Sequence, residues 1–108
     1  MSGYLYLAGP MTGLPEFNYP AFRDAADRLR AAGATVRSPH EFHGGALGLP
    51  YATYLEAGLA AARGATAIVL LPGWESSPGA TAEREAAVTA GVPILRYVDD
   101  DRPELETP

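Results

Sequence analysis

Glu83 is the residue of this sequence whose type and position are most suited to chemistry. It follows an apolar run, 67–71, and a turn rich in glycine and proline, 72–79. This order predicts a buried strand, a loop at its carboxyl end and then a helix. Ligands of open α/β sheets bind outside the carboxyl ends of the strands, and a helix N-terminus favours an ionised carboxylate. Such a carboxylate could attack an electrophilic carbon; the alternative interpretation is a solvated glutamate on a helix face.

The elements that must position this carboxylate alternate along the chain. Apolar, β-prone runs predict strands at 4–8, 34–38, 67–71 and 92–98, and helical periodicity predicts helices that begin near Pro20, Pro50 and Pro78. The spacing of the second helix predicts a buried face made of Tyr51, Tyr54, Leu55, Gly58, Leu59 and Ala62.

The alternation predicts an α/β fold, a flavodoxin- or Rossmann-like three-layer sandwich. We expect a mainly parallel sheet of four to five strands, in an order near 2-1-3-4, with helices on both faces. The topological switch point then lies between the first and third strands. The loops 9–19 and 73–83 flank this crevice, and 40–49 is predicted to be a loop.

Composition excludes several classes of function. The chain has no cysteine, so thiolate chemistry and disulfides are excluded, which fits a cytoplasmic protein. All eight basic residues are arginines, which excludes a Walker-A lysine and Schiff-base chemistry. No apolar run approaches the length of about 20 residues that a membrane span needs, and the N-terminal residues lack the basic region and long apolar stretch of a secretory signal.

Charge divides the chain into one domain, 1–98, and an acidic C-terminal tail, 99–108. The tail carries most of the net charge of −5, so the near-neutral body lacks the basic footprint that long nucleic acid requires. We expect the tail to be mobile or covered by a partner. His40 and His43 flank Glu41 in a spacing that fits no zinc motif, so we expect no metal and no cofactor.

The two crevice loops carry a family resemblance. The run Tyr-Leu-Ala-Gly-Pro-Met-Thr-Gly at 6–13 and Phe-Asn-Tyr-Pro-Ala-Phe at 17–22 resemble the opening of small nucleoside 2-deoxyribosyltransferase-like proteins, in particular a short bacterial and phage subgroup. The segment 70–83 is similar to the second signature of the same subgroup. The resemblance covers most of residues 4–97, in the same order of elements.

The resemblance implies cleavage of the N-glycosidic bond of a nucleoside or nucleotide. Glu83 matches the nucleophile that forms a glycosyl-enzyme intermediate, which water resolves in a hydrolase and a second base resolves in a transferase. Tyr6 matches a tyrosine that orients the nucleophile. Ser77 matches a position where serine accompanies 5′-monophosphate substrates. The resemblance also implies a homodimer or higher homo-oligomer.

Other residues of the crevice loops are candidates for substrate binding, each beside a structural alternative. In the structural alternative, Gly9 and Pro10 only end a strand, Ser77 only caps a helix, and Asn18 and Tyr19 only begin one. Trp74 could wall a base pocket or pack under its loop. The full set of substrate-binding candidates is Gly9, Pro10, Met11, Thr12, Gly13, Asn18, Tyr19, His40, Trp74, Ser77, Gly79 and Ala80.

The sequence departs from the family pattern at two positions. Where the family has an aspartate on the second helix and another before the third strand, this chain has Gly58 and Thr66. The departure puts proton delivery to the leaving base in doubt, and Glu56 lies on another face of the helix. A nucleotide-binding module with little or no activity is therefore the competing hypothesis, and a flavodoxin-like regulatory domain is a third.

Overall fold

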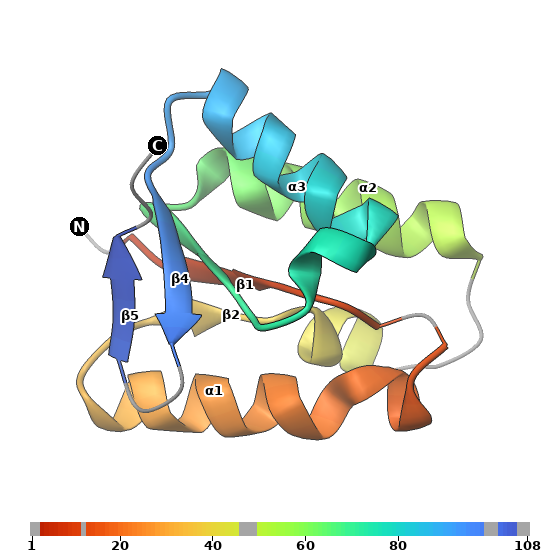
Figure 1. The fold of residues 1–108 in the computed structure, drawn as a ribbon, viewed down its shortest axis with the longest axis horizontal. Helices are drawn as coiled ribbons and strands as arrows, with labels where there is room; N and C mark the ends of the chain where they lie inside the picture. The colour runs from red at the N-terminus through yellow and green to blue at the C-terminus, as the bar shows by residue number, and fades with distance from the viewer. Residues whose placement is uncertain (1–2, 12, 46–49, 99–101, 106–108) are drawn as a thin grey trace.

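The computed structural model describes residues 3–11, 13–45, 50–98 and 102–105 of the chain. Figure 1 shows a central sheet with helices on both of its faces. In chain order the elements are β1 (Leu5–Ala8), the 3-10 turn η1 (Pro15–Asn18), α1 (Tyr19–Ala31), β2 (Val36–Arg37), the 3-10 turn η2 (Pro39–Gly45), α2 (Tyr51–Gly64), β3 (Ala67–Leu70), the 3-10 turn η3 (Trp74–Ser76), α3 (Pro78–Thr89), β4 (Ile94–Val98) and β5 (Arg102–Leu105).

The strand order is β2-β1-β3-β4-β5. β1 pairs in parallel with β2 and β3, β3 pairs in parallel with β4, and β5 is antiparallel to β4. All four residues of β3 are apolar and buried, as a central parallel strand requires when helices cover both of its faces. The α/β fold and the strand order 2-1-3-4 predicted from the sequence are confirmed.

Two hydrophobic clusters lie on the two faces of the sheet. Because side chains alternate along a strand, Tyr6 of β1 points to one face and Leu7 to the other. On the face of Tyr6 the sheet packs against α2 and α3, and on the face of Leu7 it packs against α1 (Figure 1). The first cluster contains Tyr6, Ala8, Ala61, Ala62, Ala65, Ile68, Leu70, Ala80, Ala87 and Val92.

The bounds of α1 follow from its local sequence. Pro20 lies in the first turn, where its missing N–H leaves no helical bond unmade. Gly33, just after the helix, has a φ of 101°, in the left-handed region where glycine ends helices. The buried residues of the helix share one face: Tyr19, Phe22, Ala25, Ala26 and Leu29.

The expectation for the acidic tail was wrong for residues 102–105. These residues form β5 and pair with β4, with Pro103 opposite Tyr97. An edge strand tolerates proline because one of its sides makes no ladder bonds. The sequence did not predict this strand, because acidic residues and proline are untypical of strands. The other residues of the tail lie outside the described part of the chain.

Three further elements differ from the prediction. The segment predicted as a loop after the second strand begins with η2, while residues 46–49 lie outside the described residues. The second strand is shorter than expected and covers Val36–Arg37 alone. Tyr51, predicted to be buried, is 54% exposed because the first turn of α2 extends beyond the core. No helix in the described ranges combines the length and apolar character needed to cross a membrane.

Candidate active site

Tyr6 and Glu83 meet in the layer between the sheet and the helices α2 and α3. The Tyr6 hydroxyl donates a hydrogen bond to Oε2 of Glu83 across 2.8 Å. Tyr6 is fully buried, and Glu83 is only 8% exposed. This bond joins β1 to α3 and holds the carboxylate in one position.

The position of Glu83 follows from the way α3 begins. Ser77 is the N-cap: its Oγ accepts a hydrogen bond from the backbone N–H of Ala80 at 3.1 Å, and Pro78 fills the first turn. The buried residues of the helix are Ala80, Glu83 and Ala87, which lie three and four positions apart and so share one face. Glu83 therefore faces the sheet rather than bulk solvent.

Burial controls the protonation of this pair. The loss of water around Glu83 raises the pKa of its carboxyl to about 7, and the hydrogen bond from Tyr6 opposes this rise. Burial, together with the nearby negative charge of Glu83, raises the pKa of Tyr6 well above its ordinary value. The phenol is thus a permanent donor, and the carboxyl can change its charge near neutral pH.

A cavity of about 970 Å³ opens beside Glu83. Four segments of the chain line it: the loop after β1 with the start of α1, η2, the first turns of α2, and the loop from β3 into α3. Its lining is mainly apolar and aromatic, and Glu83 is its only charged side chain among the described residues. The lining residues are Gly9, Pro10, Met11, Leu14, Phe17, Asn18, Tyr19, Pro39, Phe42, Tyr51, Tyr54, Leu55, Pro72, Gly73, Ser76, Ser77, Pro78, Gly79, Ala80 and Glu83.

Two close contacts join described parts of the loops predicted to flank the crevice. Asn18 donates from Nδ2 to the carbonyl of Pro10 at 3.0 Å and so closes the loop after β1 onto itself. Gly73 has a φ of 87°, and a Cβ on it would lie 3.3 Å from Cγ of Pro10, so the two loops approach closely there. The backbone also has positive φ values of 53°, 52° and 60° at Glu16, Phe17 and Asn18, which residues other than glycine rarely adopt.

The structure brings most of the predicted binding residues to one cavity wall, with Tyr6 behind them as the partner of Glu83. Gly13 and Trp74 are not among the lining residues: Gly13 is exposed, and Trp74 packs against the first hydrophobic cluster with Arg84 over its ring at 5.5 Å. Thr12 lies outside the described residues. The predicted residues that line the cavity are Gly9, Pro10, Met11, Asn18, Tyr19, Ser77, Gly79, Ala80 and Glu83.

Sequence reasoning missed the aromatic residues that line the cavity together with these loops. Phe42, from η2, stacks on Tyr6 with ring centroids 6.0 Å apart, and Tyr51 and Tyr54, from α2, line the same space. One signal was available. The segment after the second strand leaves the same edge of the sheet as the loop after β1, so its aromatic residues had to lie near the crevice.

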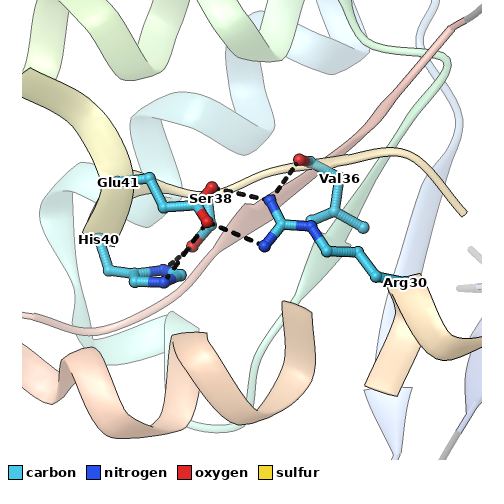
Figure 2. Close-up of polar contacts among 5 residues, drawn as sticks. All are labelled: Arg30, Val36, Ser38, His40 and Glu41. Carbon is cyan, nitrogen blue, oxygen red and sulfur yellow. Dashed lines mark hydrogen bonds and ion pairs between the residues drawn. The ribbon is translucent and has the colours of Figure 1, made fainter. Parts of the chain in front are cut away.

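His40 lies behind the cavity wall, in a cluster that fastens η2 to α1. Figure 2 shows Arg30 reaching from α1 to the carboxylate of Glu41 and to the carbonyl of Val36, with three hydrogen bonds of 2.8 Å. His40 Nδ1 is 2.6 Å from Oγ of the buried Ser38.

The His40 ring contacts the edge of Tyr19, a residue of the cavity wall, at a centroid distance of 6.1 Å. Burial lowers the pKa of His40, which keeps the ring neutral. His40 therefore supports the wall from behind and does not line the cavity.

Glu83 lies beside Gly58, and no second carboxylate among the described residues lines the cavity to replace the aspartates of the family pattern. Gly58 is buried in α2, Thr66 is exposed just before β3, and Glu56 is exposed on α2. Within the described residues no three side chains of histidine, cysteine, aspartate or glutamate form a group that could hold a metal ion.

No curated protein matches the chain significantly. Residues 3–96 match the family described as "Domain of unknown function (DUF4406)". This match runs from before β1 to Arg96 within β4 and includes the two crevice loops, Tyr6 and Glu83. The chain therefore belongs to the DUF4406 family.

Proposed function

We propose that this protein cleaves the N-glycosidic bond of a nucleoside or a nucleoside 5′-monophosphate, with Glu83 as the nucleophile. The observation that carries the proposal is a single buried carboxylate that lines a large aromatic cavity and is held by a phenol. The resemblance of the two crevice loops to nucleoside 2-deoxyribosyltransferase-like proteins supports the same assignment. No metal or cofactor takes part in this proposal.

The chemistry needs two displacements at C1′ of the sugar. In the first, an oxygen of Glu83 forms a bond to C1′ as the C1′–N bond breaks, and its electron pair leaves with the base, which gains a proton from solvent. In the second, water attacks C1′, the carboxylate is released and a proton returns to solvent. If a second base attacks instead of water, the same enzyme is a transferase. A carboxylate beside C1′ stabilises the oxocarbenium-like transition state of both steps.

The cavity wall offers surfaces for both ends of such a substrate. The rings of Tyr19, Phe42 and Tyr54 provide apolar faces against which a nucleobase could stack. Elsewhere in the lining, α3 begins with Ser77 and Gly79, where a hydroxyl and the positive end of a helix dipole could receive a 5′-hydroxyl or a phosphate.

A nucleoside-binding module without efficient chemistry is the second candidate, and one observation favours it. Glycosidases with a glutamate nucleophile usually have a second carboxyl group that protonates the leaving group. Among the described residues lining this cavity, Glu83 is the one carboxylate, and Gly58 has no side chain to supply another. Bases that leave easily would depend least on such an acid.

The exposed mouth of the cavity supports assembly into a homo-oligomer as part of the proposal. Leu14, Phe17 and Tyr51 line the cavity and are 41%, 39% and 54% exposed, which leaves apolar surface around its opening. A second copy of the chain could cover it. Light scattering during gel filtration tests this expectation, and a monomer at micromolar concentration would contradict it. As part of the proposal we place the activity in the cytoplasm, a compartment that a chain without cysteine fits.

The decisive experiment separates the enzyme from the binding module. The protein is incubated with ribo- and deoxyribonucleosides of the common bases and with their 5′-monophosphates, and free base is followed by chromatography. Base release that Glu83→Gln abolishes supports the enzyme. Saturable binding by calorimetry without base release supports the module. Neither binding nor release across the panel would contradict both candidates.

A further inference from the structure

Gly58 occupies a point of close contact between α2 and the Tyr6–Glu83 pair. The residue is buried in the middle of α2. A Cβ atom on Gly58 would overlap Oε2 of Glu83, and it would lie 3.0 Å from Cδ of Glu83 and 2.9 Å from the hydroxyl of Tyr6. The carboxylate oxygen that accepts the Tyr6 hydrogen bond therefore fills the space of the missing side chain.

A glycine in this position carries a cost that packing must offset. In the interior of a helix, glycine is about 1 kcal/mol less favourable than alanine. The neighbouring positions of α2 are rich in alanine, which forms helices well. No positive φ explains the glycine, because Gly58 has helical backbone geometry. The contact with Glu83 does explain it.

We propose that Gly58 is a positioning residue: by lacking a side chain it forms the seat in which Oε2 of Glu83 rests against α2 and the Tyr6 hydroxyl. This inference rests on the proposed function only in naming Glu83 as the reacting group. It goes beyond that function by making one position of α2 set the exposure and protonation of the nucleophile.

The geometry determines which group moves when the seat is filled. Tyr6 is fully buried and its ring stacks on Phe42, so the phenol has no room to retreat. Glu83 is the end of a flexible side chain that lines the cavity, so a methyl group at position 58 would push the carboxylate towards the cavity. There it would regain water and lose its bond to Tyr6.

The first test measures the titration of Glu83 by carboxyl ¹³C NMR in wild type and Gly58→Ala, without substrate. Burial is the largest cause of the raised pKa of Glu83. We therefore expect its pKa to fall in Gly58→Ala by about one pH unit, a roughly tenfold loss of proton affinity. An unchanged titration midpoint would overturn the proposal. Ala60→Gly, at an exposed position of the same helix, controls for helix propensity and should leave the midpoint in place.

A double-mutant cycle keeps the test valid if Gly58→Ala does not fold. In wild type, Gly58→Ala should lower the melting temperature or prevent folding. In a Glu83→Ala background the overlap with Oε2 is gone and only the 2.9 Å contact with the Tyr6 hydroxyl remains, so the same substitution should lower the melting temperature much less. Equal effects in the two backgrounds, or failure of both to fold, would overturn the inference.

Activity then separates this inference from the proposed function. If wild type releases base, the acid limb of its kcat/KM profile should move to lower pH in Gly58→Ala, together with the NMR midpoint. If wild type releases no base, the proposed reaction fails, while the titration and the cycle still decide the role of Gly58.

Discussion

Glu41 and Glu83 lie in two parts of one small fold that treat a carboxylate in opposite ways. Glu41, on η2, is half-exposed and accepts two hydrogen bonds from Arg30, and this interaction lowers its pKa. Glu83, on α3, is buried, no cation among the described residues contributes to its pKa, and burial raises that pKa to about 7. Its partner is the neutral phenol of Tyr6. Glu41 serves structure and is paired with a positive charge. Glu83 has no opposite charge as its partner in the described part of the chain and lies beside a cavity, as functional groups often do.

The largest expected difference between the two glutamates is in activity. Glu83→Gln removes the nucleophile but keeps an oxygen for the Tyr6 bond, so base release should fall by about 10³-fold or more. Glu41→Gln should change it by only a few fold, because Glu41 does not line the cavity. Chromatographic assays of both variants on one substrate measure this contrast. Similar losses in both would end the distinction drawn between the two sites.

Stability should depend on pH with opposite sign at the two sites. The raised pKa of Glu83 stabilises the folded state fully below its unfolded value of 4.5, and this contribution is lost as pH rises through about 7. Between pH 5 and 8 the loss should be roughly 2 to 3 kcal/mol. The lowered pKa of Glu41 acts in reverse: its contribution is present above 4.5 and is lost as pH falls through its folded value.

Urea unfolding of wild type and Glu83→Gln at pH 5 and pH 8 tests the first of these slopes. The variant should gain on wild type as pH rises, since the glutamine cannot ionise. An equal pH dependence in the two proteins would mean that Glu83 titrates like an exposed glutamate. Glu41→Gln is the matched control, and its difference from wild type should not grow between pH 5 and 8.

Removal of each partner sharpens the comparison. Tyr6→Phe deletes the donor that lowers the pKa of Glu83, so the acid limb of the rate profile should move to higher pH and activity at pH 7 should fall about tenfold. Arg30→Ala should cost about 1 kcal/mol or less, because both side chains of its pair are more than a third exposed. A pH–rate profile that stays in place in Tyr6→Phe would contradict the role given to the phenol.

The smallest expected effect concerns the 5′-phosphate. The guanidinium of Arg30 is hydrogen-bonded to Glu41, and no arginine is among the described residues that line the cavity. Oγ of Ser77 accepts a hydrogen bond from the N–H of Ala80, which leaves the hydroxyl proton of Ser77 to donate. This hydroxyl and the start of α3 are therefore the main donors to an anion in this part of the cavity. We expect KM for a nucleoside and its 5′-monophosphate to agree within about tenfold. A preference above a hundredfold for the monophosphate would require a cation from a second copy of the chain.

The strand order could be predicted from the sequence because it depends on local pattern and on the rules of parallel sheets. The closeness of Tyr6 to Glu83 was expected only from the family resemblance. Phe42 was missed because the segment that forms η2 looks like an ordinary loop, although its exit from the same edge of the sheet was a usable signal. Tyr51 was missed because helical periodicity makes it look buried. β5 was concealed by its acidic residues. The role of Gly58 depends on a contact between three elements distant in sequence, so it emerges only from the three-dimensional structure.

Trapping of the covalent intermediate tests the central claim most directly. A fluorine at C2′ of the sugar destabilises an oxocarbenium-like transition state, so a 2′-deoxy-2′-fluoroarabinosyl nucleoside of the preferred base should slow the second displacement and let the intermediate accumulate. Mass spectrometry of the digested protein should then find the fluorinated sugar on the peptide that contains Glu83, and not in Glu83→Gln. Turnover of this nucleoside with no adduct at any time point, or an adduct on another residue, would contradict nucleophilic attack by Glu83.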